Sequence, residues 1–153
     1  MKLEFGAKYM LKIFVSLVFL AGIIWNYSIT RKNIVRIKKK IEFILIIAIF
    51  AMVAFYLCYR FDHSLLGYCV SISAVAFAFT FIFTPGISKE GVNLFLGTTA
   101  LIKHVKFDEI KDVRYKDISE NAFALKIDVF GKTYHQIYRM EDKDRVADLI
   151  TNF

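Results

Sequence analysis

Three long runs without a charged side chain lie in the first 85 residues, and they constrain the fold more than any other feature. The first, Ile13 to Thr30, has 18 residues, which as a helix cover roughly 27 Å of a hydrocarbon core of about 30 Å. The second is Phe43 to Tyr59, and the third is Leu65 to Thr84, after which Pro85 and Gly86 discourage a helix from continuing. The sequence therefore predicts a membrane region over residues 1–85, with spans at about 13–30, 43–59 and 65–84.

The composition and the charge distribution agree with a membrane protein. Hydrophobic residues make up 57% of the 153-residue chain, and the formal net charge is +7. Residues 1–85 hold 10 Lys or Arg against 3 Asp or Glu, whereas residues 86–153 hold 11 of each. The excess positive charge thus lies beside the apolar runs, as is typical of membrane topology. The neutral C-terminal part lacks the basic surface that nucleic-acid binding needs, so we expect no nucleic-acid partner.

The first run has a second interpretation, because a cleaved signal peptide also begins with basic residues followed by an apolar segment. Lys2, Lys8 and Lys12 could form its basic region. However, the apolar run is longer than that of a usual signal peptide, and Trp25 to Ser28 lacks the small-x-small pattern of a cleavage site. We favour a retained span, and the sequence leaves cleavage open.

The loops between the runs predict the orientation. The first loop carries six basic residues and the second carries only Arg60. The six are Arg31, Lys32, Arg36, Lys38, Lys39 and Lys40. Because short basic loops stay in the cytoplasm, we expect the N-terminus outside and residues 86–153 inside. The richness in Lys, Ile and Phe suggests an AT-rich bacterial genome, and hence a bacterial cytoplasmic membrane as the location.

The third run carries small residues on one helical face, which would let another helix approach closely. They are Gly67, Ser71, Ala74 and Ala78, spaced i, i+4, i+7 and i+11. The alternative is that Ala and Ser are simply common in membrane helices. With the close-packing interpretation, we expect a protein partner or a homo-oligomer within the membrane.

No residue pattern in the chain predicts catalysis or a cofactor. Cys58 and Cys69 have similar predicted depth near the outer face, so a disulfide is one interpretation and two inert thiols are the other. His63, His104 and His135 are isolated from one another and from any Cys pair, so we expect no metal site. There is also no Gly-rich phosphate loop and no Ser nucleophile elbow. We therefore expect a protein that is not an enzyme.

Residues 86–153 change to the alternating pattern of β-strands. Phe123 to Val129 alternates apolar and polar residues. Gly131-Lys132 after it predicts a type II′ hairpin turn to a strand at 133–138. A second hairpin is predicted with strands at 92–96 and 100–107 around a Gly97-Thr98-Thr99 turn, followed by a short strand at 113–118. An amphipathic helix closes the chain, with apolar positions Val146, Leu149, Ile150 and Phe153 after the acidic start Glu141, Asp142 and Asp144.

Four to five antiparallel strands closed by a C-terminal helix, directly after membrane spans, resemble the small bacterial pleckstrin-homology-like membrane proteins of unknown function. The resemblance covers residues 86–153 and depends on the segment GISKEGVNLFLGTTALIKHVKFDEIKDVRY, with Phe107 followed by Ile110 and Val113. It implies an abbreviated α+β domain of this type. It does not imply lipid head-group binding, because the first hairpin loop, Gly97-Thr98-Thr99, lacks basic residues.

Two classes of function follow from these patterns. The first is a membrane-anchored interaction module, a subunit or regulator of a membrane complex that acts through its cytosolic domain. The second is a bacteriocin or toxin immunity-type protein, which is also small, basic and multi-span. An ordered cytosolic domain favours the first, because an immunity protein need not carry one.

Overall fold

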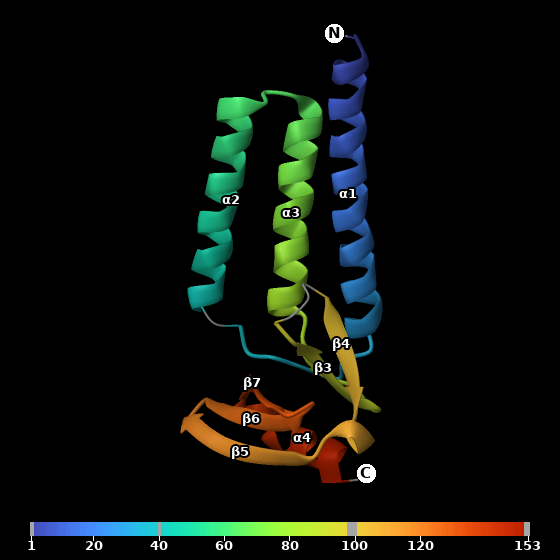
Figure 1. Ribbon diagram of the computed structural model, residues 1–153. Helices are drawn as coiled ribbons and strands as arrows, with labels where there is room; N and C mark the ends of the chain where they lie inside the picture. Colours follow the sequence, from blue (N-terminus) through green and yellow to red (C-terminus); the bar gives the residue numbers. More distant parts are fainter. Residues whose placement is uncertain (1, 40, 98–100, 152–153) are drawn as a thin grey trace.

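A stem of three helices standing on a domain of strands makes up the computed structural model, which describes residues 2–39, 41–97 and 101–151 (Figure 1). The helices of the stem are α1 (Lys2–Thr30), α2 (Ile41–Phe61) and α3 (Leu65–Phe83). The strands are β1 (Val35–Arg36), β2 (Gly86–Ile87), β3 (Gly91–Phe95), β4 (Ile102–Lys106), β5 (Asp112–Ser119), β6 (Ala122–Val129) and β7 (Lys132–Arg139). Short 3₁₀ helices at Phe107–Glu109 and Met140–Asp142 precede β5 and the last helix, α4 (Lys143–Thr151).

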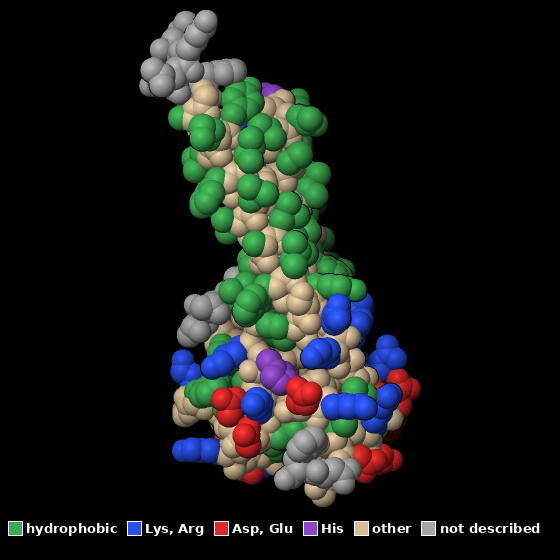
Figure 2. All heavy atoms as spheres, turned by 90° about the vertical axis from the view of Figure 1, so that its right-hand side faces the viewer, with side chains coloured by type: hydrophobic (Ala, Val, Ile, Leu, Met, Phe, Trp, Pro, Cys, Tyr) green, Lys and Arg blue, Asp and Glu red, His purple; other side chains and the backbone are tan. Residues whose placement is uncertain are grey.

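Two helices of the stem are long and apolar enough to cross a membrane. They are α1, over Gly6–Thr30, and α2. Most of their residues are exposed, and in Figure 2 hydrophobic side chains cover much of the stem above a charged domain. By length and composition, each of these two helices could therefore cross a membrane. The helix α3 has 19 residues and carries no charged side chain.

The helix α3 stands between α1 and α2 and contacts both (Figure 1). Against α1, the ring of Phe77 lies over Gly22, where any added Cβ would collide with it. The least exposed positions of α2 are Ile47, Ala51, Ala54 and Cys58, spaced i, i+4, i+7 and i+11. The stem is therefore a layer of three helices, and most of the surface of α2 faces away from the protein.

The strands form two antiparallel sheets, one with the order β1-β2-β3-β4 and one with the order β5-β6-β7. The predicted antiparallel α+β domain is confirmed at this level, but the expectation of four to five strands was too low. The strands that the sequence did not reveal are β1 and β2, with two residues each. Two residues are too few to produce an alternating pattern. Moreover, β1 comes from the basic loop between α1 and α2.

The core lies between the two sheets and under α4. Its largest fully buried side chains include Tyr138 and Phe123, whose ring centroids are 5.7 Å apart. Val146 of α4 is fully buried against them, and Leu149 and Ile150 pack at the margin. The predicted strand from Phe123 to Val129 and the amphipathic closing helix are thus confirmed. The helix position Phe153, with Thr98, Thr99 and Ala100 of the predicted first hairpin, lies outside the described residues.

The turn between β6 and β7 differs from the prediction by one residue. Val129 pairs with Lys132, so the turn residues are Phe130 and Gly131 rather than Gly131 and Lys132. Both have positive φ, +53° and +71°, which is the pattern of a type I′ turn and not of type II′. The phenyl ring of Phe130 lies 4.1 Å from the ammonium of Lys103 on β4. This cation–π contact helps to retain a bulky residue where Asn or Gly is usual.

Candidate functional site at the junction of helices and sheets

The basic loop after α1 is part of the sheet domain. The backbone N–H of Ile34 donates to Ile87 O at 2.8 Å, and Val35 and Arg36 of β1 pair with β2. The backbone N–H of Lys38 then donates to Ile137 O on β7 at 2.6 Å. One short segment thus contacts both sheets, and it holds the domain directly against one end of the stem.

The six basic residues of this loop have different roles in the structure. Arg31, Lys32, Arg36 and Lys39 are exposed, and basic side chains gather below the apolar stem in Figure 2. Lys38 is half-buried, and its ammonium donates to Asn121 O at 3.2 Å. Lys40 lies outside the described residues. Lys38 thus fixes the loop to the second sheet, whereas the exposed positions lie on the surface of the protein.

The first side chain that connects helices to strands is that of Asn26, which lies one turn before the end of α1 and is fully buried. Its amide nitrogen donates to Thr80 Oγ1 of α3 at 3.0 Å. Its amide oxygen accepts the backbone N–H of Ile102, the first residue of β4, at 2.9 Å. One side chain therefore joins two helices to the first sheet. β4 rises beside the lower turns of α1 and α3 in Figure 1.

The second connecting side chain is that of Asn93 on β3, which is also fully buried. Its amide nitrogen donates to Asn33 Oδ1, and the Asn33 amide in turn donates to Thr84 O at the end of α3 at 2.8 Å. The Asn93 amide oxygen is therefore an acceptor, and His104 Nδ1 lies 2.8 Å from it. It follows that Nδ1 carries the imidazole proton when His104 is neutral.

The polar network continues from Asn93 into the other sheet. The buried side chain of Gln136 on β7 donates from Nε2 to Asn93 O at 2.9 Å. The Tyr138 hydroxyl donates to Gln136 Oε1. Burial raises the pKa of Tyr138 well above its usual range, so its hydroxyl stays protonated and remains a donor. The network thus runs from the helices of the stem through the first sheet to the centre of the second.

The chemistry of this junction is that of a structural connection. Amides, hydroxyls and backbone groups make up most of it, together with the imidazole of His104. Across the described ranges, no three His, Cys, Asp or Glu side chains are placed to hold a metal ion. Sequence reasoning missed Asn26 and Asn93 because a single Asn at a span end or in a strand resembles any other polar residue.

Replacing Asn26 with Leu should destabilise the chain by about 2 kcal/mol, because the buried N–H of Ile102 and the hydroxyl of Thr80 lose their partner. The unfolding of the purified full chain in detergent, followed by circular dichroism, would measure the loss. Hydrogen exchange at the Ile102 amide should accelerate in parallel. Ser28→Ala, two residues further along on the exposed surface of α1, is the control. Equal stability of the Asn26 and Ser28 variants would contradict the role of Asn26.

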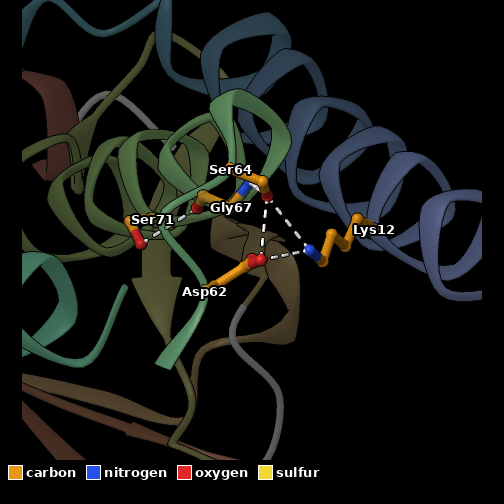
Figure 3. A network of polar contacts seen from close by, with 5 residues as sticks. All are labelled: Lys12, Asp62, Ser64, Gly67 and Ser71. Atoms are coloured by element: carbon orange, nitrogen blue, oxygen red, sulfur yellow. Dashed lines mark hydrogen bonds and ion pairs between the residues drawn. The ribbon is translucent and has the colours of Figure 1, made fainter. Parts of the chain in front are cut away.

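A second polar cluster lies at the opposite end of the stem, in the tight connection from α2 to α3 (Figure 3). The ammonium of Lys12 on α1 lies 2.5 Å from Asp62 Oδ1 and 3.1 Å from Ser64 Oγ. Ser64 donates to Asp62 at 2.9 Å and also caps α3 by accepting the N–H of Gly67 at 3.1 Å. The side chains of Lys12 and Asp62 are 26% and 28% exposed. This cluster ties α1 to the hairpin of α2 and α3.

The Lys12 hydrogen bond, followed by that of Ser64, lowers the pKa of Asp62. A carboxylate with a lowered folded-state pKa stabilises the fold at pH values above its unfolded pKa of about 3.9. That contribution is lost as the pH falls through the folded-state value. The cluster is therefore complete at neutral pH and opens only in acid.

We expect Asp62→Asn to lower the unfolding midpoint at pH 7, and we expect the difference from the unchanged chain to shrink toward pH 2.5 as Asp62 becomes protonated. Denaturation in detergent micelles across this pH range would give the difference. Asp108→Asn is the matched control, since Asp108 is exposed and makes no contact with a basic side chain in the described structure. A difference between wild type and Asp62→Asn that persisted unchanged at pH 2.5 would contradict the ion pair as its cause.

The small-residue face of α3 is directed in part at α2 of the same chain. A Cβ added to Gly67 would lie 3.0 Å from Cys58 Sγ and still closer to the Asp62 carboxylate. Ser71 Oγ lies 3.4 Å from Ala54 O. Ala74 and Ala78 are half-buried. At the first two positions of this face, Gly67 and Ser71, the helix that approaches closely is therefore α2 of the same chain.

The disulfide interpretation of Cys58 and Cys69 is not realised, and both thiols are free. Cys58 is buried against Gly67, whereas Cys69 is exposed. Two residues along a helix turn a side chain by about 200°, so Cys69 points away from the face that Gly67 presents to Cys58.

No protein-family model, curated protein or solved structure matches this chain. The interpretation of its function therefore depends on the geometry of the junction and the stem.

Proposed function

We propose that this chain is an interaction module of a bacterial cytoplasmic membrane, with three spans and a cytosolic domain fixed rigidly beneath them. In this proposal it serves as a subunit or regulator of a membrane protein complex. The observation that carries the proposal is the position of β1. Because the loop between α1 and α2 supplies a strand to the sheet, the helices and the domain form one unit and not an anchor with a flexible tether.

The case for α3 as a third span comes from its length and its polar groups. Its 19 residues cover roughly 28 Å as a helix. The hydroxyls of Ser71, Ser73 and Thr80 each donate to a backbone carbonyl within the helix, so none of them opposes insertion into lipid. It also stands between two helices that are apolar enough to cross a membrane.

The orientation is supported by the same pairing of β1 with β2. The loop that contains six basic residues and the sheet domain lie on one side of the stem, and the connection with Arg60 lies on the other. Basic loops favour the cytoplasm. The contacts of Lys12 and Asn26 support retention of α1 over its removal as a signal peptide, because cleavage would leave Asp62 and Ile102 without their partners.

The pleckstrin-homology-like assignment belongs to the proposal as well. It is supported by the seven strands of the described residues, followed by the closing helix α4, which is the strand number of a full domain of this type. The arrangement is unusual in one respect. The hairpin of α2 and α3 stands between β1 and β2 in the chain, so the spans are inserted into the domain.

The surface of α2 is the reason to propose a protein partner within the membrane. Apart from the stripe toward α3, every described position of α2 is exposed, including Phe50, Met52 and Tyr56. A single helix held on one side by small residues leaves a continuous face for a helix of another protein or of a second copy. No observation favours the immunity-type alternative, which stays a prediction of the sequence.

Cysteine labelling in intact cells tests the three spans and the orientation. In a chain lacking Cys58 and Cys69, Phe61→Cys should react with a membrane-impermeant maleimide, whereas Lys39→Cys and Lys132→Cys should be protected until the membrane is permeabilised. The expected contrast is at least about tenfold, because α2 separates Phe61 from Lys39 by the thickness of a bilayer. Labelling of Lys132→Cys in intact cells would contradict the orientation.

Photo-crosslinking along α2 tests the interaction itself. A photoreactive residue placed in turn at each position from Ile44 to Phe55 should give protein crosslinks that recur every three to four positions, because one helical face would meet the partner. Ile24 on α1, an exposed position of the opposite helix, is the comparison. Crosslinks to lipid alone at every position of α2 would contradict the proposal of a membrane partner on this helix.

A further inference from the structure

A pocket of about 640 Å³ opens between the inner end of α1 and the first sheet. Its apolar side is formed by Trp25 and Ile29 of α1. Its polar side is formed by Lys32 after the helix, by Lys89 and Glu90 in the turn from β2 to β3, and by His104 of β4. The pocket therefore has one face that suits an acyl chain and one that suits a polar group.

The two lysines of the pocket are available to a ligand. Both are exposed, and neither ammonium contacts an acceptor of the described residues. Glu90 stands beside Lys89 in the chain and makes no ion pair with it across the same residues. The formal charges of Lys32, Lys89 and Glu90 sum to +1. Two unpaired ammonium groups that approach one cavity from separate elements suit the oxygens of a phosphate.

The level of the pocket on the stem indicates where such a phosphate comes from. Trp25 is 55% exposed and lies near the inner end of α1, at the depth where tryptophan borders the head groups of a bilayer. Lys32 lies two residues after Thr30, the last residue of the helix, on the aqueous side. The apolar side thus faces the acyl region and the lysines face the head-group layer.

We propose that this pocket binds an anionic phospholipid, with its phosphate between Lys32 and Lys89 and its acyl chain along Trp25 and Ile29. The proposal rests on the membrane orientation of the proposed function. A net negative head group such as phosphatidylglycerol is favoured over phosphatidylcholine, because the choline ammonium would add a positive charge beside the two lysines. Free phosphate shares the anionic group but has nothing to occupy the apolar side.

Trp25 makes the test direct, because it is the only tryptophan in the chain. The purified full chain is reconstituted in phosphatidylcholine vesicles with a minor fraction of phosphatidylglycerol, and bromine is placed on the acyl chains of one lipid or the other. Brominated phosphatidylglycerol should quench Trp25 as if it were enriched about 25-fold over its bulk fraction, because each of two lysines near the surface contributes about fivefold. The enrichment should persist when inorganic phosphate is added.

The variants separate a pocket from a diffuse basic surface. Lys32→Gln and Lys89→Gln should each lower the enrichment by about fivefold. Arg31→Gln is the matched control, because it removes the same charge at the same depth from a residue that does not line the pocket. An equal loss in Arg31→Gln and Lys32→Gln would overturn the pocket in favour of general attraction. Circular dichroism of each variant checks that it is folded.

Three further outcomes test the pocket, the lipid occupant and the proposed function separately. Equal quenching by the two brominated lipids at their bulk ratio would overturn the pocket and leave the membrane orientation intact. Loss of the enrichment on addition of inorganic phosphate would overturn lipid as the occupant. An absence of quenching by either lipid would place Trp25 outside the bilayer and would overturn the proposed function itself.

Discussion

A buried polar group must find its partner within the protein, and at the end of the stem next to the sheets that constraint determines how the domain is attached. Asn26 meets it with one hydrogen bond to α3 and one to the backbone of β4. Asn33 meets it by joining the end of α3 to Asn93 of the first sheet. Because each of these amides is shared between a helix and a strand, the domain cannot move away without leaving polar groups unpaired in an apolar setting.

The distribution of these contacts divides the stem into a fixed part and a loosely held part. α1 is held in its N-terminal half by the ion pair with Asp62, in the middle by Phe77 of α3 over Gly22, and near its C-terminal end by Thr80 and β4. α3 continues into β2 with only Thr84 and Pro85 between them. α2 is held mainly by one stripe of small and apolar residues. A partner that binds α2 would therefore disturb the fold least.

The sequence predicted the features that arise from long or repeated patterns. Apolar length located the helices of the stem, and alternation located β6, because burial on one face imposes a period of two over many residues. It could not locate β1 or β2. A strand of two residues has no period, and Val35 lies among basic residues that indicated only a loop. β1 pairs with β2 because the loop between α1 and α2 lies beside Gly86 in space, and local sequence patterns do not encode such a contact.

The turn at Phe130 and the amides of the junction escaped prediction for a related reason, since their neighbours in space determine their roles. Gly131 indicated a turn correctly, but the register depends on the pairing of Val129 with Lys132 and on Lys103 lying over the Phe130 ring. The face that begins at Gly67 was predicted to contact a protein partner or a second copy of the chain. Its closest neighbours are Asp62 and Cys58, so the connection from α2 to α3 uses this space. A small-residue pattern therefore identifies where a backbone can approach closely, whereas the length of the adjoining loop decides whether the helix that approaches comes from the same chain. With only Asp62, His63 and Ser64 between α2 and α3, the approaching helix is α2, and a partner from another chain must use a different face.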